Sequence, residues 1–146
     1  MPYRKAHAVW EGDLQAGHGT MSLGSGAYEG TYSFQTRMGD APGTNPEELI
    51  GAALAGCFSM ALSNGLAKAA QAPRRVSTDA KVHFEKQESG WAISSIDLLT
   101  EVEVEGLDEE RFKAIAEDAK KNCPVSKALA GTEIRLDAKL LSGASR

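Results

Sequence analysis

One stretch of the sequence, residues 45–70, constrains the fold more than any other. After a polar start at Asn45-Pro46-Glu47-Glu48, the residues are apolar on nearly every side of a helix. Asparagine is a good N-cap, proline suits the first helical position, and the two glutamates complement the positive end of the helix dipole. A helix that is apolar all round must be enclosed by other elements. We therefore expect a long, buried, central helix.

The segments on either side of this helix have the two-residue alternation of strands. Apolar and polar residues alternate most clearly over 76–85, and the alternation changes phase at Ser94-Ser95, which predicts a bulge or bend. Asp108 is a suitable cap for a second helix, and Pro124 can open a short third one. Strands are predicted over 3–10, 30–36, 76–85, 91–104 and 134–140, and a short strand between two turns is predicted within 17–26.

The predicted order of elements is βββ-α-ββ-α(α)-β. This order is typical of an α+β fold, in which a curved antiparallel sheet surrounds one buried helix. No repeat, linker or low-complexity block interrupts the 146 residues. We therefore expect a single domain over residues 1–146, which is an ordinary length for one hydrophobic core.

Composition argues against several classes of protein. The net charge of −4 gives no basic surface for nucleic acid or for an anionic membrane. The apolar stretch is rich in Ala, Gly and Ser, so we expect no membrane span, and no apolar segment typical of a secretory signal follows the first residues. Two cysteines and three scattered histidines form no zinc motif. We expect a cytoplasmic protein with no metal and no bound cofactor.

Cys57 lies in the middle of the predicted central helix and has two interpretations. Free cysteine is among the most buried residue types, so the pattern alone favours a small core residue. The alternative is an activated nucleophile. Burial raises the pKa of a thiol, so a reactive Cys57 needs a cation beside it. Arg37 is the one arginine in a segment that leads directly into this helix. One charge pair at about 4 Å is worth roughly 4 kcal/mol at an effective dielectric constant near 20, before desolvation.

Glu47 poses a question of distance. It lies ten residues before Cys57 on the same predicted helix, hence about 15 Å away along the helix axis. The two side chains cannot act on one substrate within a single chain. If both act at one site, the glutamate comes from a second chain. The pattern alone favours a simpler role, in which Glu47 only complements the helix N-terminus.

Two motifs point to a known family. The stretch Thr44-Asn45-Pro46-Glu47-Glu48-Leu49-Ile50-Gly51-Ala52-Ala53, with Ala55-Gly56-Cys57-Phe58-Ser59-Met60-Ala61 after it, resembles the signature of the OsmC/Ohr family of bacterial thiol peroxidases. Cys123-Pro124-Val125-Ser126 resembles the second cysteine motif of that family. The segments His7-Ala8-Val9-Trp10-Glu11-Gly12-Asp13 and Phe34-Gln35-Thr36-Arg37 are more similar to the osmotically inducible OsmC branch than to the organic hydroperoxide resistance branch. The similarity extends over essentially the whole chain.

The resemblance implies an OsmC-like fold and an intertwined homodimer with active sites shared between subunits. It implies that Cys57 is the peroxidatic cysteine and Cys123 the resolving cysteine. Arg37 would activate Cys57 and would itself be oriented by Glu47 of the partner chain. The implied activity is reduction of organic hydroperoxides, and less efficiently of hydrogen peroxide, in oxidative and osmotic stress defence. The Cys57–Cys123 disulfide would then be reduced by an external dithiol, of which a lipoyl-type dithiol is one example.

Two functions of other classes fit the same residues. The first is a non-enzymatic protein whose apolar pocket binds a hydrophobic ligand, with Cys57 as a lining residue. The second is a thiol redox sensor, in which oxidation of the two cysteines changes a surface for a partner. Turnover of peroxide separates both from an enzyme, since a binding protein consumes no peroxide and a sensor is recycled slowly.

Overall fold

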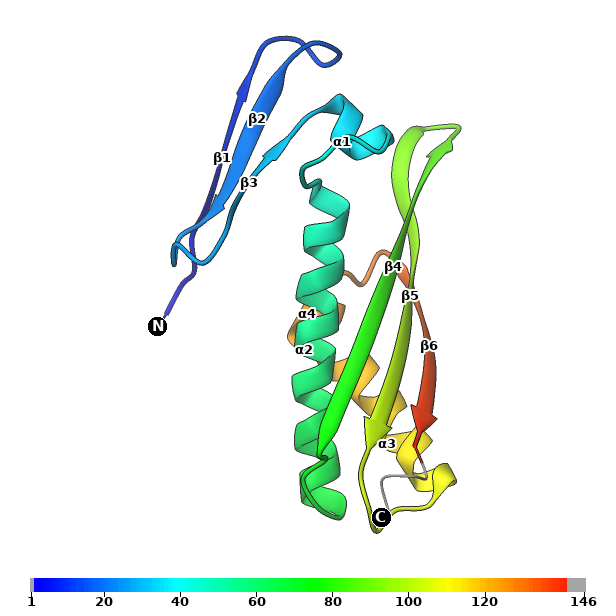
Figure 1. Ribbon diagram of the computed structural model, residues 1–146. Coiled ribbons are helices and arrows are strands. Elements are labelled where there is room, and N and C mark those ends of the chain that lie inside the picture. Colours follow the sequence, from blue (N-terminus) through cyan, green and yellow to red (C-terminus); the bar gives the residue numbers. More distant parts are fainter. Residues whose placement is uncertain (1, 142–146) are drawn as a thin grey trace. The chain divides into compact units, whose positions relative to one another are not determined.

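The computed structural model describes residues 2–141, which form two compact units. The first unit ends at Leu49 and the second begins at Ile50. Each contains one three-stranded sheet, and Figure 1 labels their helices and strands. The α+β class is confirmed, but the strands form two sheets rather than one. The expectation of a single domain over 1–146 stays a prediction.

The first unit is an antiparallel sheet followed by a short helix. Its strands are β1 (Ala6–Glu11), β2 (His18–Leu23) and β3 (Glu29–Tyr32), in that order across the sheet. The helix α1 (Phe34–Met38) follows directly. The predicted strand over 30–36 is therefore wrong after Tyr32. Ser33 caps the helix, because its hydroxyl accepts from the Thr36 N–H while the Thr36 hydroxyl accepts from the Ser33 N–H.

The long helix α2 (Pro46–Ala69) begins where the sequence predicts. The Asn45 side chain accepts a hydrogen bond from the Glu48 N–H at 2.8 Å, so Asn45 is the N-cap. The Glu48 carboxylate also reaches back across the cap, where it accepts a hydrogen bond of 2.7 Å from the Thr44 hydroxyl. The first turn of α2 is thus held by side chains on both sides of Pro46.

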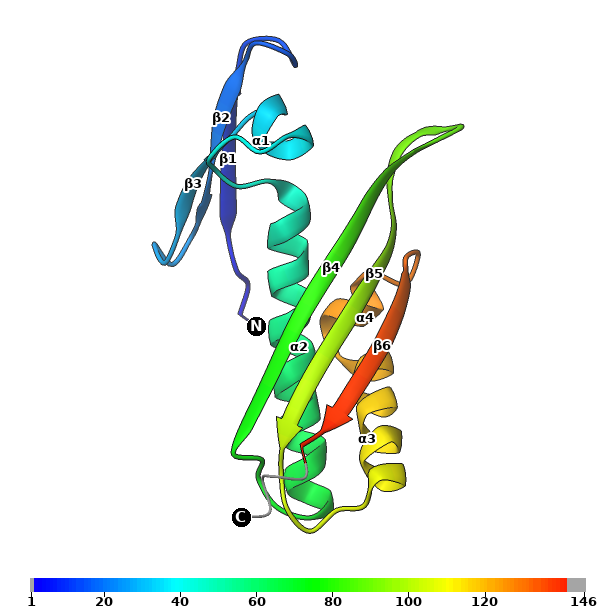
Figure 2. The same ribbon diagram turned by 45° about the vertical axis from the view of Figure 1, so that its right-hand side comes forward.

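The second unit is a mixed sheet with helices on one face (Figures 1 and 2). Its elements after α2 are β4 (Arg75–Gln87), β5 (Gly90–Glu103), α3 (Glu109–Asn122), α4 (Pro124–Ala128) and β6 (Glu133–Leu140). β4 and β5 pair antiparallel, and the register shifts between His83 and Phe84 so that Ser94 is left over. The predicted bulge is confirmed. β6 pairs parallel with β5, so the expectation of a wholly antiparallel sheet is wrong. The helices α3 and α4 supply the crossover that parallel neighbours need.

An ion pair between Asp97 and Arg135 joins the parallel strands β5 and β6. The Arg135 Nε donates to the Asp97 carboxylate at 2.6 Å, and the Arg135 Nη2 donates to the Ser95 hydroxyl at 2.9 Å. His83 on β4 contacts the same carboxylate at 2.8 Å. Hydrogen bonds from Arg135 and His83 lower the pKa of Asp97 to about 2. All three strands are therefore tied at one carboxylate.

The core of the second unit lies between α2 and the sheet. One ridge of α2, at a spacing of four residues, is completely buried: Leu54, Phe58, Leu62 and Leu66. It packs with Ile96, Leu98 and Val102 of β5 and with Phe112 and Ala116 of α3. Figure 2 shows the sheet in front of these helices. Burial of such side chains contributes roughly 1.5–3 kcal/mol each.

The opposite side of α2 is exposed. Met60 is 77% exposed, and Ala53 and Gly56 beside it are also exposed. We expected α2 to be enclosed on all sides, but within a single chain one of its sides is exposed. By length and composition α2 would even suit a membrane span, which the sequence interpretation did not expect. That is weak evidence for a membrane, because the core helix of a soluble protein passes the same test, and one ridge of α2 is core.

A chain of hydroxyl groups crosses the apolar layer between α2 and the sheet. Thr100 donates to the Ser77 carbonyl at 3.2 Å, so its oxygen accepts from Thr78 at 2.9 Å. Thr78 in turn accepts from Ser59 of α2 at 2.8 Å. Each hydroxyl has one proton, so the direction of the chain is fixed. Ser59 is two residues beyond Cys57, and the chain therefore fixes α2 on the sheet near the thiol.

Replacing Thr100 by valine should lower the free energy of unfolding by about 1–3 kcal/mol. The shape is kept, but Thr78 loses its acceptor and Ser77 its side-chain donor in a partly buried setting. Urea unfolding measures the change. Thr100→Ser is the matched control, since it keeps the hydroxyl and loses only a methyl group, worth about 0.8 kcal/mol. A valine variant as stable as the wild type would show that the chain contributes nothing.

Candidate active site

Cys57 is half-buried on α2 and packs against the core of the second unit. Its pKa is raised above the ordinary value, chiefly because burial disfavours the thiolate. The Val125 N–H opposes this effect by donating to the sulfur, while the Cys123 thiol adds to it. All of these groups belong to the second unit. Within that unit Cys57 is therefore a neutral thiol at neutral pH, and its activation needs a charge from elsewhere.

Cys123 is buried between α3 and α4, with 1% of its surface exposed. Pro124 prevents helical geometry in the residue before it, and Cys123 has an extended backbone. Its N–H donates to the Ala119 carbonyl and so makes the last hydrogen bond of α3, while its side chain caps α4. The Ser126 hydroxyl lies 3.1 Å from its sulfur.

The two thiols lie together although they are far apart in the sequence. Cys57 and Cys123 share a hydrogen bond, and neither is in a disulfide. The turn that carries Cys123 also supplies the Val125 N–H to Cys57. Pro124, at the first position of α4, leaves the next two backbone N–H groups free to donate, which is the usual state of a helix N-terminus. The result is a pair of sulfurs held by one turn of backbone.

Arg37 and Glu47 form a second pair, in the first unit. The Arg37 Nη2 donates to Glu47 Oε2 at 2.6 Å, and its Nε donates to both carboxylate oxygens at 3.1 Å. Glu47 is only 7% exposed, whereas the Arg37 side chain is more open. A guanidinium that pairs side-on with a carboxylate is fixed in orientation. The amide of Asn45 also donates to the Thr36 carbonyl at 3.3 Å, which ties α1 to the start of α2.

The four predicted residues thus fall into two pairs, one in each unit. The sequence interpretation assigned Glu47 of a second chain to Arg37, and that assignment is wrong. Arg37 pairs with Glu47 of its own chain. The loop over 38–44 turns back so that α1 meets the first turn of α2, and no periodicity in the sequence predicts such a turn.

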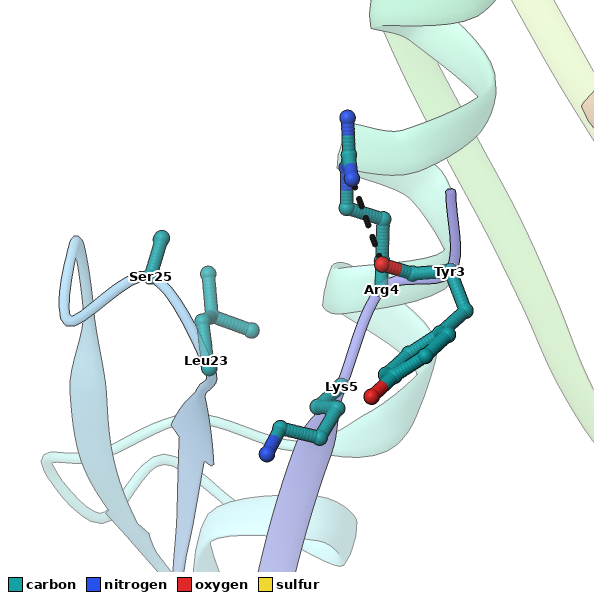
Figure 3. Close-up of a pocket in the computed structure, with 6 residues that line it drawn as sticks. Tyr3, Arg4, Lys5, Leu23 and Ser25 are labelled. Carbon is teal, nitrogen blue, oxygen red and sulfur yellow. Dashed lines mark hydrogen bonds between the residues drawn. The ribbon is translucent and has the colours of Figure 1, made fainter. Parts of the chain in front are cut away.

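The first unit also has a cavity of about 530 Å³. It is lined by Tyr3, Arg4, Lys5, Leu23, Gly24 and Ser25. Figure 3 shows Tyr3, Arg4 and Lys5 on the segment that enters β1, with Leu23 at the end of β2 and Ser25 on the loop that follows. None of the predicted site residues lines it. Over residues 2–141, no three His, Cys, Asp or Glu side chains gather as a metal site would require.

Comparison with known proteins decides the family. A family model described as OsmC-like protein matches residues 39–139. The chain belongs to the OsmC family. It is 48% identical over 141 residues to the peroxiredoxin OsmC of Escherichia coli K12, which covers 96% of this chain and 98% of that one.

Solved structures of OsmC-like proteins agree with this assignment. The organic hydroperoxide resistance protein OhrB of Bacillus subtilis is 26% identical, with a TM-score of 0.70 over 94% of this chain and 98% of that one. An organic hydroperoxide resistance protein from Elizabethkingia anophelis has a TM-score of 0.75 at 23% identity, over 97% of this chain and 99% of that one. The second likeness supports the fold alone.

Ser126 and Val125 are two residues of this OsmC-family site to which the sequence interpretation gave no role. Both follow Cys123-Pro124, and the signal was present there. A capping residue before proline predicts that the N–H groups two and three positions later point back toward the cap. In agreement with that rule, the Ser126 N–H donates a hydrogen bond to the Cys123 sulfur at 3.4 Å.

Proposed function

We propose that this chain is a two-cysteine thiol peroxidase that reduces organic hydroperoxides and, less efficiently, hydrogen peroxide. The observation that carries the proposal is the contact between two reduced thiols, Cys57 and Cys123, beside an apolar core. Membership of the OsmC family and the names of the relatives support it. The apolar side chains around Cys57 favour hydroperoxides with hydrocarbon tails.

Arg37 supplies the positive charge that activates Cys57. The thiol pKa is raised by burial, and the thiolate is the form that attacks a peroxide. A guanidinium beside the sulfur lowers that pKa, and it also stabilises negative charge on the leaving oxygen. Glu47 holds the guanidinium in one orientation through the paired hydrogen bonds.

The Arg37–Glu47 pair comes to Cys57 from a partner chain. Glu47 and Cys57 are on one continuous helix, about 15 Å apart along its axis. A guanidinium that is bonded to Glu47 stays near the start of the helix and does not reach the thiol farther along it. The Arg37–Glu47 pair therefore acts on Cys57 of a second copy of the chain. The exposed apolar side of α2, around Met60, supports a homodimer. Each of the two active sites then combines two cysteines from one chain with Arg37 and Glu47 from the other.

The reaction has three steps. The Cys57 thiolate attacks the distal peroxide oxygen, the O–O bond breaks, and the alkoxide leaves as an alcohol, so that Cys57 becomes a sulfenic acid. Cys123 then displaces hydroxide from that sulfur, which gives a disulfide and water. An external dithiol, of which a lipoyl-type dithiol is one example, restores both thiols by exchange. No bound cofactor or metal takes part. We assign the protein to the cytoplasm, where such dithiols stay reduced.

Peroxide consumption tests the proposal directly. The purified protein with dithiothreitol should consume cumene hydroperoxide over many turnovers, and hydrogen peroxide more slowly. One equivalent of hydroperoxide without reductant should remove two thiols per chain and leave a Cys57–Cys123 disulfide in the peptide map. Absence of turnover with retained binding of an apolar dye would favour the ligand-binding alternative. Disulfide formation without recycling by any dithiol would favour the sensor.

A further inference from the structure

The second thiol of the site is held by one neighbouring side chain. The Ser126 hydroxyl lies 3.1 Å from the Cys123 sulfur, and the Ser126 N–H donates to the same sulfur at 3.4 Å. Ser126 is 7% exposed and Cys123 is 1% exposed. A buried hydroxyl needs a hydrogen-bond partner, and here the contact is the thiol. Two polar groups of one residue therefore converge on one sulfur.

The backbone fixes this arrangement. Cys123 is the N-cap of α4, Pro124 is its first residue, and Ser126 is its third. In that position the side chain of the cap and the third residue of the helix face each other. The cap geometry therefore brings the Ser126 hydroxyl and the Cys123 sulfur together.

Disulfide formation requires negative charge on the Cys123 sulfur, and Ser126 can stabilise that charge. Cys123 has to attack the oxidised Cys57 as a thiolate. Negative charge at a buried atom is costly unless hydrogen-bond donors face it. Groups that are already in place cost little reorganisation when the charge develops. Ser126 supplies two of them: its backbone N–H, which already donates to the sulfur, and its hydroxyl, whose proton can turn toward the sulfur.

We infer that Ser126 is a catalytic residue of the disulfide-forming step, in which its hydroxyl donates to the Cys123 sulfur as charge develops there. The inference rests on the proposed function. In this step an S–S bond forms between Cys123 and Cys57, and the S–O bond of the Cys57 sulfenic acid breaks. Cys123 is oxidised and Cys57 is reduced. The released hydroxide and the proton lost by Cys123 together make one water molecule.

This role differs from that of Arg37. Arg37 acts on Cys57 and the peroxide in the first step, whereas Ser126 contacts the sulfur that reacts in the second. A change at Ser126 should therefore separate the two steps. Cys57 would be oxidised normally but would remain as a sulfenic acid for longer. A long-lived sulfenic acid is exposed to a second peroxide molecule, which converts it to a sulfinic acid.

Single-turnover kinetics of Ser126→Ala test the inference. The reduced protein is mixed with one equivalent of cumene hydroperoxide, and peroxide loss and disulfide formation are followed separately by quenching and intact mass. Peroxide loss should stay within about twofold of the wild type. Disulfide formation should slow by about tenfold, which corresponds to the loss of one hydrogen bond to a charged group. The pH profile of disulfide formation should also move to higher pH.

Two further variants make the result specific. Ser126→Thr keeps the hydroxyl and should form the disulfide at half the wild-type rate or faster. Ser95→Ala removes an equally buried serine hydroxyl in the same unit, one that bonds Arg135 and not a sulfur, and should change neither step. Equal slowing of both steps in Ser126→Ala, or equal slowing of disulfide formation in the threonine and alanine variants, would overturn the inference. So would an unchanged pH profile.

Failure of the proposed function and failure of the role assigned to Ser126 give different results. If the wild-type protein consumes no hydroperoxide, the proposed function fails and the comparison ends there. If the wild type turns over and Ser126→Ala forms its disulfide at the wild-type rate, only the role of Ser126 fails.

Discussion

Replacing Cys57 by serine should reduce hydroperoxide turnover to the rate of the dithiol alone, a loss of more than about a thousandfold. Serine has the same shape, but its hydroxyl stays protonated and does not attack peroxide at neutral pH. The half-buried position of Cys57 tolerates the change, so the fold should be retained. Continuous measurement of cumene hydroperoxide loss with dithiothreitol in excess gives the rate.

Cys123→Ser is the matched control for this loss. It removes the other thiol of the pair and leaves the first chemical step in place. One equivalent of hydroperoxide should still be consumed at the wild-type rate, with one thiol lost and no disulfide formed. A Cys57→Ser variant that retained turnover would transfer the peroxidatic role to Cys123 and remove the basis of the proposed mechanism.

Chains with different defects should restore activity to each other. Cys57→Ser and Arg37→Ala homodimers should each be nearly inactive. When the two are unfolded and refolded together in equal amounts, about half of the dimers are mixed. In a mixed dimer one site combines an intact Cys57 with an intact Arg37–Glu47 pair from the other chain. We expect about a quarter of the wild-type activity per chain.

A second mixture checks that the restored activity has this origin. A chain carrying both Cys57→Ser and Arg37→Ala, refolded with equal wild-type chain, leaves no complete site in the mixed dimer. About a quarter of the wild-type activity should remain, all of it in wild-type homodimers. If Arg37 acts on Cys57 of its own chain instead, this second mixture retains about half, and the first mixture stays inactive.

The helix starts and the bulge were predictable because local chemistry determines them. Asn45, Asp108 and Pro124 each cap or open a helix through groups within three or four residues. The bulge at Ser94 follows from a change of phase in the alternation. Such features need no knowledge of the rest of the chain.

The errors arose where the same pattern fits two structures. Tyr32 and Phe34 suit a strand at a period of two, but Ser33 and Thr36 cap each other and begin a helix. Alternation along 134–140 predicts a strand without its direction, so the parallel pairing with β5 was missed. An apolar helix was taken to be enclosed by its own chain, although one side of it is exposed.

The candidate site could be predicted as a set of residues but not as an arrangement. The motifs around Cys57 and Cys123 identified the two thiols through a family resemblance. Helix length alone excluded Glu47 from the Cys57 site of its own chain. The partner of Glu47 was not predictable, because the approach of Arg37 depends on a loop rather than on a periodic element.

The cap of α4 couples the proposed cysteine chemistry to a short helix. The reduced Cys123 sulfur accepts the Ser126 N–H and thereby begins a helix of five residues. So short a helix has little stability without its cap. In the proposed disulfide the same sulfur is bonded to Cys57, so any shift of the sulfur on oxidation acts on the start of α4. The redox state of the two cysteines should therefore be readable in the backbone amides of a single helical turn, and exchange with a dithiol should return them to the capped form.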